Sequence, residues 1–116
     1  MNSVSDIDTP AAVVDIRRMQ ANIDRMQQRM NQLGVAFRPH VKTSKCLPVF
    51  ERLLAAGARG LTVSQLKEAE PVFAAGITDI LYAVGLVPGR LPLALARRRG
   101  GCVLTGSSDS VVAAQA

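Results

Sequence analysis

The chain has very few aromatic residues: no tryptophan, one tyrosine and three phenylalanines among 116 residues. Strands of β-sandwiches are rich in aromatic and β-branched residues, so a sandwich is not expected. Proteins that bind single-stranded nucleic acid stack bases on aromatic side chains, which this chain hardly offers. The core must be built from alanine, valine, leucine, isoleucine and methionine, and alanine and leucine favour helices.

Histidine and cysteine are also scarce. The chain has one histidine, His40, and two cysteines, Cys46 and Cys102, whose separation fits no metal-ligand spacing. We therefore expect no metal site within this chain and two free thiols, as in a cytoplasmic protein. No stretch reaches the roughly 18 to 20 apolar residues of a membrane span, and the polar start lacks the apolar region of a signal peptide. These features predict a cytoplasmic location and no membrane partner.

The net charge is +5 and the isoelectric point is about 10. Most of the cations in the first part of the chain are spread along one expected helix. The run Arg97–Arg99 ends another expected helix, where the helix dipole favours cations. Nucleic-acid binding would need these charges gathered in a stripe. We therefore expect no nucleic-acid partner.

Short apolar segments alternate with amphipathic ones, and glycines stand where helices should end. The pattern predicts strands at 11–15, 35–41, 60–63, 79–84 and 102–105, and helices between 16 and 33, 43 and 57, 64 and 76, 91 and 99, and 109 and 116. Apolar strands joined by crossover helices imply a parallel sheet. A barrel of the TIM type needs eight such units, so we predict an α/β chain forming about the first half of a parallel β/α barrel.

Two details of the helices follow from the same pattern. Apolar residues at steps of three and four, among them Met19, Met26 and Met30, predict a core-facing stripe on the first helix. Hydroxyl side chains before the next two helices predict Thr43 or Ser44 as one N-cap and Ser64 as the other, because such side chains accept hydrogen bonds from free helix N–H groups.

Lys42 stands at the carboxyl end of the expected strand 35–41 and just before a helix. Reactive groups of α/β proteins gather at this edge of the sheet. A lysine that is desolvated there has a lowered pKa and forms a Schiff base readily. Its position alone leaves open the alternative that Lys42 simply pairs with a neighbouring carboxylate.

Three segments in order carry a family resemblance: Asp8-Thr9-Pro10 with residues 11–15, Arg38-Pro39-His40-Val41-Lys42-Thr43, and residues 56–63. They resemble the start of the D-threonine aldolase and D-serine dehydratase family. The resemblance implies a pyridoxal 5'-phosphate enzyme with an alanine-racemase-like barrel, in which Lys42 holds the cofactor. It also implies a divalent metal in the full-length parent, with ligands outside this chain. Many relatives have histidine in place of Ser44, which leaves aldolase and dehydratase open.

Three further residues are candidates for binding this cofactor. Side chains alternate along a strand, so Arg38 and His40 are expected on the same face as Lys42. Tyr82 is expected at the same mouth of the barrel, near the end of its strand. Each has a structural alternative: a carboxylate partner for Arg38, a backbone hydrogen bond for His40 and a structural hydrogen bond for Tyr82.

The resemblance implies that the parent protein cleaves D-threonine-like β-hydroxy-α-amino acids to glycine and an aldehyde. D-serine-type dehydration is the runner-up, followed by an amino-acid racemase or a non-catalytic pyridoxal-phosphate-binding protein. We expect residues 1–116 to be the amino-terminal portion of the cofactor-binding barrel domain, without the carboxyl-terminal domain. Such a piece is expected to be inactive alone and to self-associate through open sheet edges, or to belong to a homo-oligomer.

Overall fold

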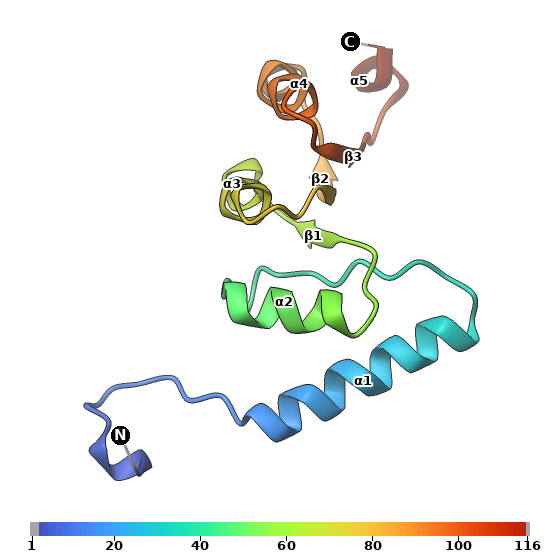
Figure 1. Cartoon of the computed structure of the whole chain (residues 1–116). Coiled ribbons are helices and arrows are strands. Elements are labelled where there is room, and N and C mark those ends of the chain that lie inside the picture. Colours follow the sequence, from blue (N-terminus) through green and yellow to red (C-terminus); the bar gives the residue numbers. More distant parts are fainter. Residues whose placement is uncertain (1–2, 116) are drawn as a thin grey trace.

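The computed structural model describes residues 3–115 as a three-stranded parallel sheet with helices beside it (Figure 1). The elements run in the order η1 (Val4–Asp6), α1 (Ile16–Gln32), α2 (Leu47–Ala55), β1 (Leu61–Val63), α3 (Leu66–Ala74), β2 (Asp79–Gly85), η2 (Pro88–Arg90), α4 (Leu91–Arg99), β3 (Val103–Ser107) and α5 (Val111–Gln115). None of the described helices is long and apolar enough to cross a membrane.

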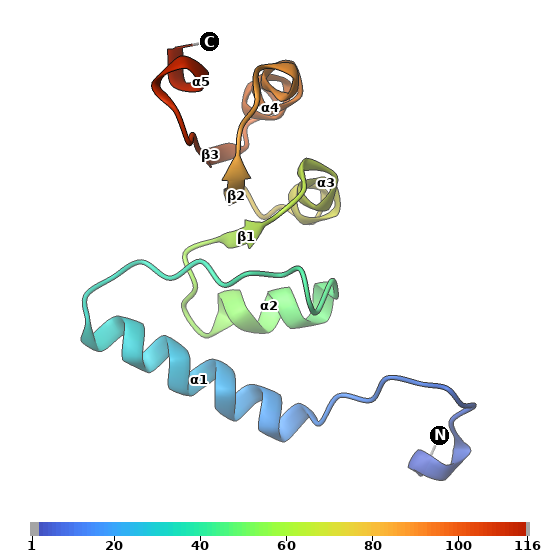
Figure 2. The same ribbon diagram turned by 180° about the vertical axis from the view of Figure 1, so that it is seen from behind.

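The strands follow one another across the sheet in chain order. β1 pairs in parallel with β2, and β2 pairs in parallel with β3. Helix α3 connects the first pair and α4 the second, and both helices lie on the same side of the strands in the two opposite views (Figures 1 and 2). Parallel neighbours need such crossovers. The predicted β/α repeat is therefore confirmed for this part of the chain.

The segment expected as strand 35–41 lies beside β1 but is not a regular strand. His40 forms an isolated parallel bridge with Thr62. The Thr62 N–H donates to the carbonyl of Pro39 at 2.8 Å, and the Val41 N–H donates to the carbonyl of Thr62 at 3.0 Å. Proline has no N–H to donate, so Pro39 interrupts the ladder. The sequence correctly predicted that residues 35–41 lie beside the next strand and run parallel to it. The prediction that they form a regular strand was wrong.

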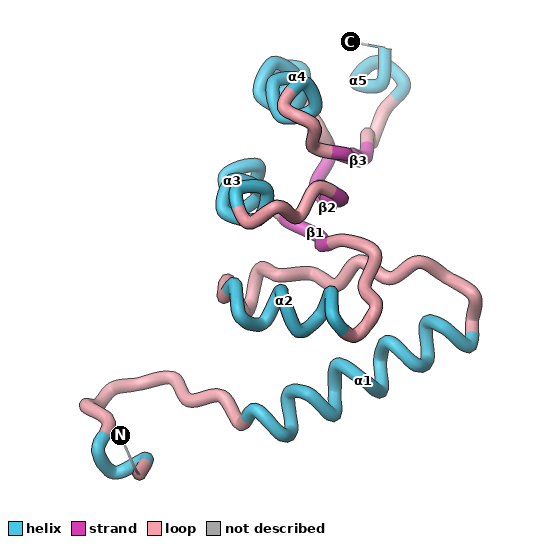
Figure 3. The backbone as a smooth tube through the Cα atoms, viewed as in Figure 1, coloured by secondary structure: helices cyan, strands magenta, loops and turns pink. Residues whose placement is uncertain are grey.

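The expected strand at 11–15 is absent. These residues are exposed and extended, and they precede α1 as a connecting segment at one extremity of the molecule (Figure 3). A strand needs a neighbour to satisfy its backbone groups, and residues 3–115 place none beside this segment. The carboxylate of Asp15 instead caps α1 by accepting a hydrogen bond from the Arg18 N–H at 3.0 Å.

The hydrophobic core lies between the sheet and its helices. Leu61, Val63 and Ile80 are completely buried. The register pairs Leu61 with Ile80 and Val63 with Tyr82, so these four side chains share the helix-facing side of the sheet. Val41 joins this core from the edge segment. Thr62, which alternates with them, faces the other side.

Helix α1 is less buried than its stripe predicts. Among its apolar residues only Ile23 is buried, while Met26 is 47% exposed. The prediction of a core-facing methionine stripe was wrong for Met26, because in the described part of the chain α1 lies against α2 and not against the sheet (Figure 1). The Arg52 side chain of α2 donates to the Gln20 amide oxygen of α1 at 3.0 Å.

Two predicted N-caps were also wrong. Helix α2 begins after Cys46, because Thr43 and Ser44 belong to a turn that follows Lys42. Helix α3 begins after Gln65. The helix ends were predicted better: Gly34, Gly57 and Gly76 have φ values of 65°, 114° and 82°, the left-handed conformation that stops a helix.

Candidate cofactor-attachment site

Lys42 lies at the carboxyl end of the edge segment, where the chain leaves the sheet. It opens a turn that closes when the Lys45 N–H donates to the carbonyl of Val41 at 3.0 Å. The Lys42 side chain is exposed and forms no ion pair with any residue between 3 and 115. The carboxylate-paired alternative is therefore not what the described residues show. The expected desolvation is not supplied by them either.

His40 lies two residues before Lys42. Its Nδ1 accepts a hydrogen bond from the Lys42 N–H at 3.2 Å. The neutral imidazole ring then carries its proton on Nε2, which makes that atom a donor. The bridge to Thr62 places His40 on the side of the sheet that faces away from the helices. The structure thus brings His40 and the Lys42 backbone together and fixes one tautomer of the ring.

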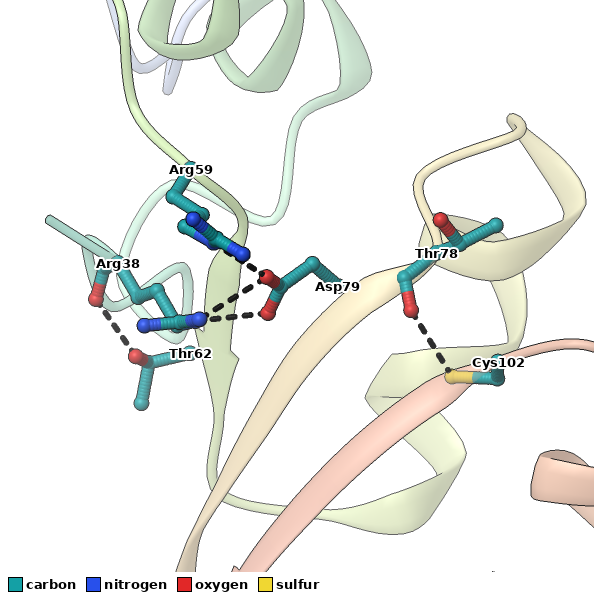
Figure 4. A network of polar contacts seen from close by, with 6 residues as sticks. All are labelled: Arg38, Arg59, Thr62, Thr78, Asp79 and Cys102. Atoms are coloured by element: carbon teal, nitrogen blue, oxygen red, sulfur yellow. Dashed lines mark hydrogen bonds and ion pairs between the residues drawn. The ribbon is translucent and has the colours of Figure 1, made fainter. Parts of the chain in front are cut away.

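Arg38 is occupied elsewhere (Figure 4). Its Nε and Nη2 atoms donate to the two carboxylate oxygens of Asp79 at 2.7 and 2.9 Å, and Arg59 Nε approaches the same carboxylate at 3.4 Å. Asp79 begins β2, so this network lies at the amino end of the strands, opposite to Lys42. The structure shows the carboxylate partner that was the alternative for Arg38, and does not bring Arg38 to Lys42.

The same network sets the ionisation of its carboxylate. The hydrogen bonds from Arg38 lower the pKa of Asp79, and this effect outweighs burial, which acts in the opposite direction. Gly60 lies beside the network, and a Cβ there would stand 2.1 Å from the Asp79 carbonyl oxygen. The absence of a side chain at Gly60 is therefore what lets β1 and β2 approach each other here.

Tyr82 lies on the other side of the sheet from His40. It pairs in register with Val63 and is only 8% exposed within the hydrophobic core. It also lines a pocket of about 420 Å³ at the start of α3, together with Ser64 and Arg90. The structure therefore does not bring Tyr82 together with His40 and Lys42.

Two residues that the sequence analysis missed lie next to the Lys42 turn. Lys45 Nζ is 3.2 Å from Glu68 Oε1. Glu68 Oε2 accepts hydrogen bonds from the Ser64 N–H, the Ser64 hydroxyl and the Gln65 N–H at 3.0, 3.1 and 3.2 Å. Burial acts to raise the pKa of the Glu68 carboxyl, but these bonds and Lys45 together hold it below its usual value.

The sequence contained a signal for one of these residues only. Glu68 stands at the third position of helix α3, where a glutamate accepts a hydrogen bond from the N-cap N–H, as in the second half of a capping box. Nothing comparable pointed to Lys45, because its role depends on the conformation of its turn. Among residues 3–115 the structure contains no group of three or more histidine, cysteine, aspartate or glutamate side chains suited to hold a metal ion.

The chain is similar in sequence to enzymes that act on D-amino acids. It is 66% identical over 110 residues to the D-threo-3-hydroxyaspartate dehydratase of Delftia sp. (strain HT23). The aligned region covers 95% of this chain and 29% of the relative. It is 42% identical over 88 residues to the D-threonine aldolase of Arthrobacter sp, covering 75% of this chain and 23% of the relative. The chain thus spans less than a third of the length of these relatives.

The fold agrees with that similarity. The solved structure of D-threo-3-hydroxyaspartate dehydratase from Delftia sp. HT23 superposes with a TM-score of 0.90 at 65% identity, over 94% of this chain and 29% of that one. The family model described as "Alanine racemase, N-terminal domain" matches residues 14–114. That range holds the parallel β/α repeat and the Lys42 turn, and the chain belongs to the alanine racemase N-terminal domain family.

Proposed function

We propose that the protein containing this chain is a pyridoxal-phosphate-dependent lyase for D-β-hydroxy-α-amino acids, with Lys42 as the point of cofactor attachment. The observation that carries the proposal is the state of the Lys42 side chain. It is exposed at the carboxyl end of the edge segment and has no carboxylate partner between residues 3 and 115. An amine that no ion pair holds can reach an aldehyde carbonyl, while its activation must come from groups other than the described residues. Membership of this family supports the choice of cofactor.

The neighbouring residues fit such a cofactor. When bound, pyridoxal phosphate supplies an electron sink for charge that develops on the substrate, while the protein supplies attachment and orientation. Lys42 Nζ would form the covalent attachment. His40 is fixed by the Lys42 N–H so that Nε2 carries a proton to donate on the same side of the sheet.

Both cysteines are free thiols, which suits a cytoplasmic location.

Lys42 is favoured over its two lysine neighbours for a geometric reason. Lys45 Nζ is engaged by Glu68, and Lys67 lies in the first turn of helix α3 and not at the end of the edge segment. Borohydride reduction of the cofactor-loaded protein followed by peptide mapping tests the assignment. We expect a phosphopyridoxyl label on Lys42 and none on Lys45 or Lys67. A label on Lys45 with Lys42 unlabelled would refute the attachment site.

We propose elimination of water as the reaction, giving a keto acid and ammonia. The order of the two candidates in the sequence analysis is reversed here, because the relative named as a D-threo-3-hydroxyaspartate dehydratase is 66% identical and the one named as a D-threonine aldolase is 42% identical. Aldol cleavage of D-threonine-like substrates is the second candidate, and racemisation or cofactor binding without catalysis is the third.

The two lyase reactions are distinguished by their products. The complete encoded polypeptide, loaded with pyridoxal phosphate and a divalent metal, is incubated separately with D-threo-3-hydroxyaspartate and with D-threonine. Ammonia and a keto acid from the first substrate would support dehydration. Glycine and acetaldehyde from the second, without ammonia from the first, would favour aldol cleavage instead. The Lys42→Ala variant serves as the inactive control for both incubations.

A further inference from the structure

Lys45 has an unusual backbone conformation. Its φ of 41° is the only positive φ at a non-glycine residue among residues 3–115. A residue with a Cβ adopts this left-handed conformation at a cost in free energy, so surrounding contacts must hold it. The side chain is itself 63% exposed, and its ammonium group reaches Glu68 Oε1 at 3.2 Å.

Glu68 is suited to hold such a contact in place. Its side chain is only 13% exposed. One carboxylate oxygen accepts three hydrogen bonds from Ser64 and Gln65, which join the end of β1 to the start of α3. The other oxygen takes the ammonium of Lys45. The carboxylate therefore links the Lys42 turn to the hydrogen-bonded junction of β1 and α3.

The turn itself is held at both ends. At its start, the Lys42 N–H donates to His40 Nδ1, and Val41 is bonded to β1 through the carbonyl of Thr62. At its end, the Lys45 N–H donates to the Val41 carbonyl at 3.0 Å. If Lys45 leaves its left-handed conformation, this second bond is strained and the backbone of Lys42 moves with it.

We propose that Lys45 and Glu68 form a positioning pair that fixes the turn carrying Lys42, and thereby the direction of its amine. The pair acts through the backbone of residues 42–45, because Lys45 closes the turn that Lys42 opens. The inference rests on the proposed function for its effect on the cofactor, although the effect on the turn itself does not require any cofactor. The lowered pKa of Glu68 favours the charged carboxylate that this ion pair needs.

The first test needs no cofactor. Amide hydrogen exchange over residues 42–45 is compared in the wild-type complete polypeptide and in Lys45→Met, Glu68→Gln, Lys45→Arg and Lys67→Met. We expect exchange about tenfold faster in Lys45→Met and Glu68→Gln, since a hydrogen bond to a charged group is lost. Lys45→Arg should stay near wild type. Lys67→Met is the matched control, since it removes the same charge one residue from Glu68 and should leave exchange unchanged.

The second test measures the dissociation constant of pyridoxal phosphate by absorbance titration. We expect it to rise about tenfold in Lys45→Met and in Glu68→Gln. The double variant should bind pyridoxal phosphate no more weakly than the single variant with the higher dissociation constant, because the two substitutions remove the same interaction. Glu68→Gln keeps an oxygen that can accept from Ser64, so the start of α3 is retained in that variant.

The outcomes separate this inference from the proposed function. Unchanged exchange in Lys45→Met and Glu68→Gln, or additive effects on cofactor binding in the double variant, would overturn the positioning pair. Faster exchange in both variants, with no phosphopyridoxyl label on Lys42 of the wild-type protein, would have two meanings. It would show that the pair holds the turn, and it would refute the proposed function. Faster exchange with weaker cofactor binding and rescue by Lys45→Arg supports both.

Discussion

Asp79 joins three segments of the chain through one carboxylate, which accepts hydrogen bonds from Arg38 and Arg59. The Asp79 side chain is 20% exposed, so solvent screens the interaction only in part. We expect Asp79→Asn to lower the free energy of unfolding by about 2 kcal/mol, the range for hydrogen bonds to charged groups. Urea unfolding at neutral pH measures the change, and Asp24→Asn on the exposed side of α1 is the control.

The same interaction predicts a pH dependence. Because the folded pKa of Asp79 lies below its unfolded value, its stabilisation is complete above about pH 4 and is lost as the pH falls through the folded pKa. The wild-type protein should therefore lose stability more steeply below about pH 4 than Asp79→Asn does. Equal slopes for the two proteins over that range would contradict the assignment.

Gly60 and Gly89 offer a matched pair of glycine substitutions. A Cβ at Gly60 would lie 2.1 Å from the Asp79 carbonyl oxygen, whereas nothing lies within 4 Å of a Cβ at Gly89. We expect Gly60→Ala to destabilise the protein by about 2 to 3 kcal/mol, because backbone atoms must move to remove the overlap. Gly89→Ala should change stability by less than about 0.5 kcal/mol. Equal thermal midpoints for the two variants would rule out the close approach.

At the scale of elements, helix α1 allows a test of which side is buried. Ile23 is 8% exposed and Met26 is 47% exposed, although both belong to the same apolar stripe. We expect Ile23→Ala to cost about 2 to 3 kcal/mol through the cavity that it leaves. Met26→Ala should cost less than about 1 kcal/mol. A larger loss at Met26, measured by urea unfolding, would mean that another part of the polypeptide covers this side of α1.

The elements themselves were largely readable from the sequence. The β/α alternation followed from apolar runs and from glycines at helix ends, which depend on residues close together in the chain. The two strand predictions that failed concern the first two segments of the chain. Residues 11–15 have no pairing partner in the described part of the chain, and Pro39 interrupts the ladder with β1. Pairing is a property of the neighbour as well as of the segment, so local sequence did not decide it.

At the scale of the whole molecule, the described residues form an open arrangement. The radius of gyration is 16.8 Å, against about 13 Å for a compact domain of this length. The sheet does not close within residues 3–115, and apolar side chains such as Val84 and Val103 remain 45% and 60% exposed. Open edges and exposed apolar residues promote association.

We therefore propose that the isolated 116-residue chain self-associates and does not turn over substrate, since the described residues leave Lys42 open to water. Light scattering of the purified chain should show species larger than 12.3 kDa, and addition of pyridoxal phosphate with D-threo-3-hydroxyaspartate should release no ammonia above background. The complete encoded polypeptide is the control. A monomeric chain, or one with enzyme-like turnover, would contradict this proposal.

The sequence by itself determined the order of strands and helices, the helix stops at glycine and the place of Lys42 after the edge segment. These features follow from the spacing of residue types along a short stretch. Only the tertiary structure decided that Tyr82 faces the helices, since Leu81 and Tyr82 are both apolar enough to face the core and the register with Val63 selects between them. The tertiary structure also decided which cations meet the carboxylates of Asp79 and Glu68.

Arg38 meets Asp79 across 41 positions of the chain, and Lys45 meets Glu68 through a left-handed turn. Such contacts depend on strand register and on a backbone conformation held by its surroundings. Neither is encoded in the residues of one segment alone.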